Sequence, residues 1–167
     1  RNFNYPIWEP KVKTFIDSSD LYNPSVVKKG LFFDLETSFE FFRYNDNFKQ
    51  DMFLVKVGPR FVYGDFKKKF LDYTEISIYP RFKFNRGESP FIFDQIVDNR
   101  AIEIAAKQQI FGPLTLKISS EINIEDDFKD DRLLNPTVNL GFNRRAYKFE
   151  LFYNLESEAG GFTFNIH

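Results

Sequence analysis

The sequence predicts an all-β fold, an antiparallel up-and-down β-sheet. Apolar and polar residues alternate with a period of two along most of the 167 residues, and the spacing that is typical of a helix is scarce. The alternating segments are also long. Most come near or above the ~9–11 residues that a tilted strand needs to cross a bilayer, whereas soluble strands cluster near ~5–6.

Each alternating segment separates its side chains into two faces. In 31–43 one face carries leucine and phenylalanine, and the opposite face carries Asp34, Glu36 and Glu40. On a helix these acids would be scattered around the cylinder, whereas on a strand residues two apart point the same way. Segment 114–124 shows the separation most regularly. In chain order the predicted strands are 31–43, 52–63, 72–85, 100–109, 114–124, 136–143, 146–153 and the C-terminal strand 161–167.

Residues 1–30 are predicted to form an N-terminal segment of undefined form, and residues 31–167 the strands. Three prolines interrupt the first range, so that only Val12 to Ile16 is expected to form a further strand. No repeat or linker divides the chain. From residue 86 onward the links between strands alternate long and short, which is typical of outer-membrane barrels with short turns on one rim and longer loops on the other.

Composition argues against several kinds of function. Lys+Arg 23 against Asp+Glu 24 leaves a net charge of -1, so no basic field exists to attract nucleic acid. With Cys 0 and His 1, a Ser-His-Asp triad, a thiolate zinc site or a multi-histidine metal site is not expected. We therefore expect a protein that is not an enzyme and that has no catalytic residue, cofactor or metal site. No apolar run is long enough for a transmembrane helix.

Three features favour a barrel whose apolar face is turned outward. The polar faces carry bulky charges of both signs along whole strands, which a water-filled lumen accepts. Aromatic residues gather towards strand ends, as they do where a barrel meets the membrane–water interface. The chain also finishes within an alternating aromatic strand, GFTFNIH. These features predict an antiparallel up-and-down transmembrane β-barrel.

This barrel assigns the side chains of the strands to a lumen and to lipid. The lumen-facing candidates are Asp34, Glu36, Glu40, Lys56, Arg60, Arg81, Lys83, Glu103, Lys107, Lys117 and Glu121. The candidates for the lipid-facing surface or the aromatic girdle are Phe33, Phe39, Phe41, Phe53, Phe61, Tyr63, Phe82, Phe84, Tyr147, Phe149, Tyr153, Phe162 and Phe164.

The C-terminal half carries a more specific likeness. The stretches FDQIVDNR, QQIFGPL, GFNRRAYKFELFYN and GGFTF lie within 89–125 and 135–167. They resemble a cyanobacterial outer-membrane family, a domain of unknown function that is similar to the C-terminal β-barrel part of LptD, the lipopolysaccharide-assembly protein.

The resemblance implies that the chain is the C-terminal part of a larger barrel in the outer membrane of a Gram-negative-type, cyanobacterial cell. Such a barrel exports lipopolysaccharide into the outer leaflet, with membrane lipid and other envelope transport proteins as partners. It needs no catalytic residue, only a seam between its first and last strands that opens sideways. Gly160 and Gly161 would weaken pairing there, and they fit a simple loop-to-strand junction equally well.

Two other functions stay open. One is a small self-contained outer-membrane barrel that serves as an anchor or adhesin, in which residues 1–167 close alone. The other is a soluble lipocalin-like protein that holds an apolar ligand inside its barrel. An aromatic-rich soluble sandwich is the structural alternative.

Smaller charged clusters each have a structural and a functional interpretation. The acids of 31–43 fit a hydrated wall better than a glycosidase pair. The acidic cluster within 125–131 lacks the spacing of a calcium loop, so a solvated loop is expected. Lys67 to Lys69 and the pair Arg144 and Arg145 are expected to be charged turns, with contact to anionic headgroups as the functional alternative.

Overall fold

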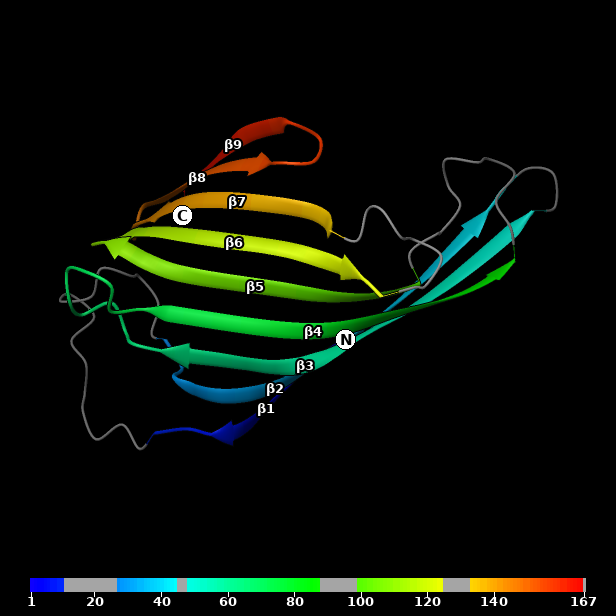
Figure 1. Ribbon diagram of the computed structural model, residues 1–167, viewed down its shortest axis with the longest axis horizontal. Helices are drawn as coiled ribbons and strands as arrows, with labels where there is room; N and C mark the ends of the chain where they lie inside the picture. Colours follow the sequence, from blue (N-terminus) through cyan, green and yellow to red (C-terminus); the bar gives the residue numbers. More distant parts are fainter. Residues whose placement is uncertain (11–26, 45–47, 88–98, 125–132, 167) are drawn as a thin grey trace.

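The computed structural model describes residues 1–10, 27–44, 48–87, 99–124 and 133–166. They form one open antiparallel sheet of nine strands, ordered as in the chain (Figure 1). Within the described residues, no helix is long and apolar enough to span a bilayer. The strands are β1 (Asn2–Trp8), β2 (Gly30–Arg43), β3 (Lys49–Tyr63), β4 (Thr74–Gly87), β5 (Arg100–Phe111), β6 (Leu114–Asn123), β7 (Leu133–Asn143), β8 (Tyr147–Asn154) and β9 (Ala159–Ile166).

The prediction of an all-β, antiparallel up-and-down sheet is confirmed, and β2 to β9 lie where the alternation places them. β1 was not predicted because Pro6 interrupts it. As the first strand of the sheet, β1 has a neighbour on one side only, so a missing N–H is tolerated. Its pairing with β2 shifts register between Pro6 and Trp8. The expected strand from Val12 to Ile16 lies outside the described residues.

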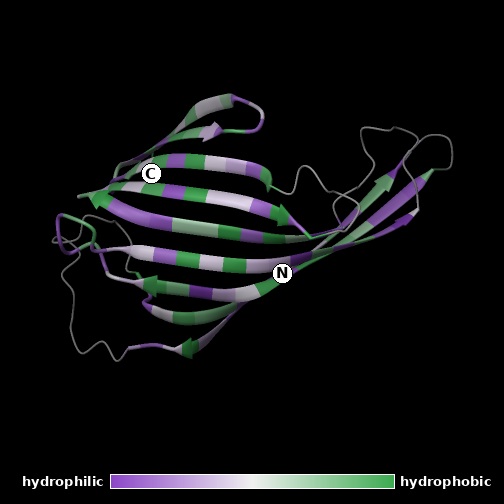
Figure 2. Cartoon of the chain, viewed as in Figure 1, coloured by the Kyte–Doolittle hydropathy of each residue, from purple (hydrophilic) through white to green (hydrophobic). Residues whose placement is uncertain are grey.

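Continuous register carries the alternation across the sheet. Glu36 lies opposite Lys56, Lys56 opposite Arg81, and Arg81 opposite Ala101. Directly opposed residues point to the same side of a sheet, so such rows keep to one face. We call the face with these four residues the polar face and the opposite one the apolar face. Figure 2 shows the resulting alternation of hydrophilic and hydrophobic bands along the strands.

Three strands continue beyond their neighbours. The pairing of β1 with β2 ends at Glu36, and that of β5 with β4 ends at Phe82. Past these points, within the described part of the chain, residues 38–43, 49–54 and 84–87 pair only among β2, β3 and β4. They form a three-stranded arm at the right of Figure 1.

The apolar core lies at the opposite end of the sheet, on the polar face. Phe32, Val62, Phe66 and Tyr73 form a buried cluster, in which the rings of Phe66 and Tyr73 stack with centroids 4.4 Å apart. Phe66 and Tyr73 belong to residues 64–73, which join β3 to β4 and which we call the rim loop. The rim loop therefore closes one end of the polar face with apolar side chains.

A buried amide ties the rim loop to β5. Gln109 is 0% exposed. Its Oε1 accepts hydrogen bonds from the backbone N–H groups of Asp72 and Tyr73, at 3.0 and 3.3 Å. Its Nε2 donates to the carbonyl oxygens of Lys68 and Gly112, at 3.0 and 2.7 Å. One side chain thus satisfies four backbone groups that no strand ladder serves.

Candidate functional site

The two sets of predicted site residues lie on opposite faces. Asp34, Glu103 and Lys117 and the other eight lumen-facing candidates all lie on the polar face, as the strand registers show. All thirteen lipid-facing candidates lie on the apolar face. The odd or even position of each residue along its strand was enough to assign it to one face or the other. Their contact with a lumen or with lipid stays a prediction.

Burial is inverted relative to a soluble sheet. The most buried strand residues lie on the polar face and include Gln50 at 2% and Asn123 at 2% exposure. On the apolar face Phe84 is 59% exposed, and Phe162 is 70% exposed. Large aromatic side chains therefore meet the surroundings while amides and charges are packed together. We take the polar face as the candidate functional site.

Ion pairs on the polar face reach across intervening strands. The ammonium of Lys56 in β3 lies 2.6 Å from the carboxylate of Glu103 in β5, and the guanidinium of Arg81 in β4 lies 2.7 Å from Glu121 in β6. Strands two apart are about 9–10 Å apart in a flat sheet. Ala101 of β5 lies directly opposite Arg81, and its small side chain leaves room for Arg81 to reach Glu121. That these side chains meet indicates that the sheet curves toward the polar face and makes it concave.

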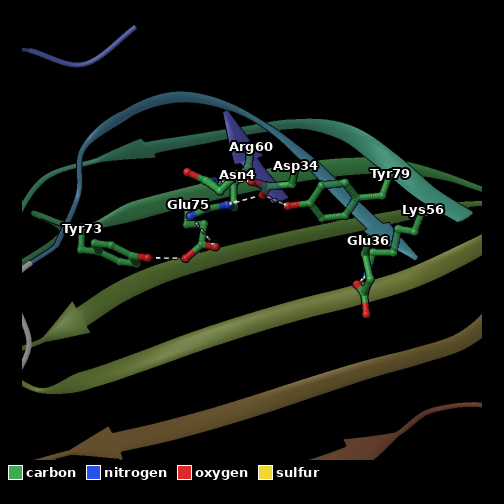
Figure 3. Close-up of polar contacts among 8 residues, drawn as sticks. All are labelled: Asn4, Asp34, Glu36, Lys56, Arg60, Tyr73, Glu75 and Tyr79. Atoms are coloured by element: carbon green, nitrogen blue, oxygen red, sulfur yellow. Dashed lines mark hydrogen bonds and ion pairs between the residues drawn. The ribbon is translucent and has the colours of Figure 1, made fainter. Parts of the chain in front are cut away.

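Asp34 is the centre of a hydrogen-bonded cluster that spans four strands (Figure 3). One of its oxygens accepts from Arg60 Nε at 2.7 Å and from the Tyr79 hydroxyl at 2.7 Å, and the other accepts from the amide of Asn4. Arg60 also lies 3.9 Å from Glu75, whose carboxylate accepts from a tyrosine of the rim loop. With both oxygens occupied by protein groups, Asp34 is a structural carboxylate, and its place in a hydrated wall stays a prediction.

A hollow of about 510 Å³ lies beside this cluster. Glu36 and Lys56 line it, 3.8 Å apart, together with Lys28. Lys28, Lys56 and Arg60 line the hollow together with Asp34 and Glu36, and Phe3 and Leu35 add apolar surface, so the hollow has mixed charge and mixed polarity. Glu40 lies farther along β2, in the arm opposite Met52, and does not join these carboxylates.

The sequence reasoning did not single out two residues that organise this face. Tyr79 supplies a hydroxyl to Asp34, and its ring lies under the ammonium of Lys56, 4.9 Å from ring centroid to nitrogen. Tyr79 is an even number of residues away from Glu75 and Arg81 in β4, so the alternation in the sequence already placed these three side chains on one face. Gln109 shares the parity of Lys107, but nothing in the sequence indicated its four hydrogen bonds.

The basic clusters have structural partners. The backbone N–H groups of Lys67 and Lys68 donate to the carboxylate of Asp72, at 2.9 and 3.3 Å. The ammonium of Lys69 lies 4.8 Å from the ring centroid of Phe111. The expected charged turn accounts for these contacts, and contact with headgroups stays a prediction. The acidic cluster within 125–131 lies outside the described residues.

One carboxylate of the rim loop is held in its charged form. Asp65 lies 3.0 Å from the ammonium of Lys29 and 3.6 Å from that of Lys67. Burial by itself would raise the pKa of Asp65. The hydrogen bond and charge of Lys29, with the charge of Lys67, outweigh burial and lower the pKa below its ordinary value of 3.8.

Together, fold and site define an all-β chain in which one open antiparallel sheet separates a concave polar face from an exposed apolar face. The chain belongs to the family described as "Protein of unknown function (DUF3769)", which it matches over residues 2–167. No curated protein and no solved structure matches it. The predicted membership of a family of unknown function is therefore confirmed, while the likeness to LptD and the cyanobacterial source stay predictions.

Proposed function

We propose that this sheet forms part of the wall of an outer-membrane β-barrel, the C-terminal part of an LptD-like protein that exports lipopolysaccharide into the outer leaflet. The observation that carries the proposal is the inverted burial. A soluble barrel turns its apolar face inward around a core or ligand, whereas here the apolar face is the exposed one.

The extent of the apolar face supports a lipid environment. Soluble monomers rarely expose contiguous apolar patches of more than a few hundred Å². Exposed aliphatic residues such as Ile78, Ile104 and Ile118 occupy the middle of three neighbouring strands on this face. In water this surface would favour aggregation, and in a bilayer it needs no cover because lipid tails are equally apolar.

Aromatic side chains at both ends of the apolar face fit a girdle at two interfaces. In the arm, the ring of Phe53 lies 5.7 Å from that of Phe39 and 6.2 Å from that of Phe84. At the opposite end the ring of Tyr147 lies 6.1 Å from those of Phe142 and Phe164. These rows are continuous across adjacent strands, as a girdle requires.

The open edges favour the larger barrel over the self-contained one. β1 and β9 are the outer strands of the sheet, and each pairs with one neighbour. A membrane barrel has no free edge, because unsatisfied backbone groups in lipid cost several kcal/mol each. In the proposed barrel, strands beyond the nine described ones complete the wall, and the concave polar face lines a hydrated path for the charged head of a glycolipid.

Two experiments test the proposal. The complete barrel that contains this chain is refolded into phosphatidylcholine vesicles, with single tryptophans at Phe84 or Ile104 on the apolar face and at Ser119 on the polar face, in a background that carries Trp8→Phe and no other tryptophan. Brominated acyl chains should quench the first two and spare the third. In the producing cell, depletion of the protein should lower lipopolysaccharide at the surface.

Each experiment has a contradicting result. A monodisperse β-protein in plain buffer, without detergent, would exclude a membrane wall and favour the soluble readings. Normal surface lipopolysaccharide after depletion, with quenching intact, would retain the barrel and reject export. In that case the anchor or adhesin function would take its place.

A further inference from the structure

Two lysines face each other in register on the polar face. Lys107 of β5 lies directly opposite Lys117 of β6. Such cross-strand neighbours have Cβ atoms about 4.5–5.5 Å apart, and like charges there are destabilising. Among the described residues no carboxylate lies within 4.0 Å of either ammonium. The ammonium nitrogen of Lys107 lies 5.8 Å from the centroid of the Tyr73 ring.

The same two strands show how this sheet neutralises a like-charge pair elsewhere. Glu103 lies directly opposite Glu121, two pairs of polar-face residues away from the lysines. Each glutamate receives its own cation, Lys56 at 2.6 Å and Arg81 at 2.7 Å. The acidic pair is therefore compensated within the chain, and the basic pair is not.

The acids closest to the lysines are engaged by other groups. Glu75 and Glu150 are the carboxylates whose charge reaches Lys107. Glu150 lies 2.9 Å from the ammonium of Lys148, and Glu75 accepts from the hydroxyl of Tyr73 and lies 3.9 Å from Arg60. Two positive charges are left without a matching negative charge of their own.

The lysines line a hollow that has polar walls and an open floor. Its volume is about 260 Å³, and Thr115, Asn139, Phe152 and Thr163 line it beside the two ammonium groups and the carboxylate of Glu150, which lies 2.9 Å from the ammonium of Lys148. Gly141 lies in the floor, where a Cβ atom would meet Thr115 Oγ1 at 3.0 Å. The absence of a side chain at Gly141 keeps the hollow open.

We propose that this hollow is a binding subsite for a phosphoryl group, held by Lys107 and Lys117. A phosphomonoester carries about -1.5 to -2 charges at neutral pH, which matches two ammonium groups. Lysine binds phosphate as a point charge, and the hydroxyl and amide groups of the walls can donate to its oxygens. The subsite goes beyond the proposed function and does not rest on it, because the polar face exists whether or not the apolar face contacts lipid.

The test is calorimetric titration of the full chain, in whichever medium keeps it monodisperse, at ionic strength fixed with chloride. Inorganic phosphate is the first probe. Dihexanoyl phosphatidic acid, a monomeric lipid with a phosphomonoester, is the second, with dihexanoyl phosphatidylcholine as its control. Binding of the first probe indicates a site open to free phosphate, and binding of the second alone indicates a lipid-borne group.

Three variants identify the site. Lys107→Gln with Lys117→Gln should weaken binding at least about tenfold, since charge-assisted hydrogen bonds are lost. Gly141→Ala should weaken it without changing charge. Lys68→Gln, which removes an exposed lysine of the rim loop, should leave it unchanged.

The proposal fails if neither probe binds more tightly to the native chain than to the double variant. It also fails if Lys68→Gln weakens binding as much, since the attraction would then be general. Should the double variant be poorly folded, the comparison of Gly141→Ala with the native chain decides, and equal affinity of those two overturns the proposal. None of these results depends on whether the chain inserts into vesicles.

Discussion

Among the described residues, Gln109 is the one whose side chain hydrogen-bonds the largest number of backbone groups. We expect Gln109→Leu to lower the free energy of unfolding by about 4 kcal/mol or more, because four backbone groups lose their partner and each buried group left unpaired costs about 1–3 kcal/mol. Urea denaturation measures the change. The matched control is Gln108→Leu on the apolar face, where the half-buried amide contacts Thr74 and one carbonyl. Equal losses for both variants would contradict this role of Gln109.

Asp65 should make stability depend on pH in the acid range. Its pKa is lower in the folded chain than in the unfolded one. The ionised carboxylate therefore stabilises the fold above pH ~4, and this stability is lost as the pH falls through the lower, folded pKa. Acid titration of unfolding should show a stability difference between native and Asp65→Asn protein that is present at neutral pH and shrinks below pH ~4.

Lys29 provides the control for this pH dependence. Lys29→Gln removes the 3.0 Å partner of Asp65, so most of the acid-dependent difference should disappear in that background. A difference that grows as the pH falls would show that the carboxylate is held neutral in the native fold and would reverse the assignment.

At the scale of single elements, Gly58 marks a close approach of β3 and β4. A Cβ atom there would lie 2.1 Å from the backbone oxygen of Ile78, which cannot move independently of its strand. We expect Gly58→Ala to destabilise the chain by about 2–3 kcal/mol through strain between the two strands. Thermal or urea unfolding measures it.

Gly141→Ala is the matched control for that substitution. The atom that a Cβ would meet at Gly141 is the side-chain oxygen of Thr115, at 3.0 Å, and a side chain can turn away. A small loss is expected here. If both alanine variants lose the same stability, general β-propensity rather than close approach explains the effect.

The strands themselves were largely predictable, because apolar and polar residues alternate with a period of two in segments such as 31–43 and 114–124. The assignment of charged and aromatic residues to two faces follows from the same parity. β1 was not predicted, because Pro6 argues against a strand in the interior of a sheet. Proline is tolerated in an edge strand, but the sequence alone does not indicate which strand lies at the edge. A charged turn was expected within the rim loop, but its tie to the sheet was not predicted, because that tie comes from Gln109, about 40 residues away in the chain.

The partners on the polar face were the least predictable part. Lys56 is paired with Glu103 across β4. The spacing of residues in the sequence does not predict an ion pair that skips a strand. Such contacts depend on the curvature of the sheet and on small residues such as Ala101. The Lys107 and Lys117 pair illustrates the converse, since register had to be known before the two lysines could be placed opposite each other.

For the whole molecule, the proposed membrane wall predicts opposite responses of the two faces to a new charge. Ile104→Arg places a cation at the middle of the apolar face, where a lipid-facing charge costs about 2–4 kcal/mol. Ser119→Arg places the same cation on the polar face and should cost little. Folding into vesicles, followed by urea titration, measures both.

The contradicting result is specific. An effect of Ile104→Arg within about 0.5 kcal/mol is typical of a substitution at a water-exposed surface. It would show that the apolar face does not contact lipid in the folded state.

The order of the strands also restricts how the sheet can be completed. Eight antiparallel pairings connect β1 to β9, so these two outer strands run in the same direction. Joining them directly would create a parallel ladder, which is slightly less stable per residue. An entirely antiparallel ring instead requires an odd number of strands inserted between them. Whatever chain supplies those strands, parity dictates that the finished ring has an even count.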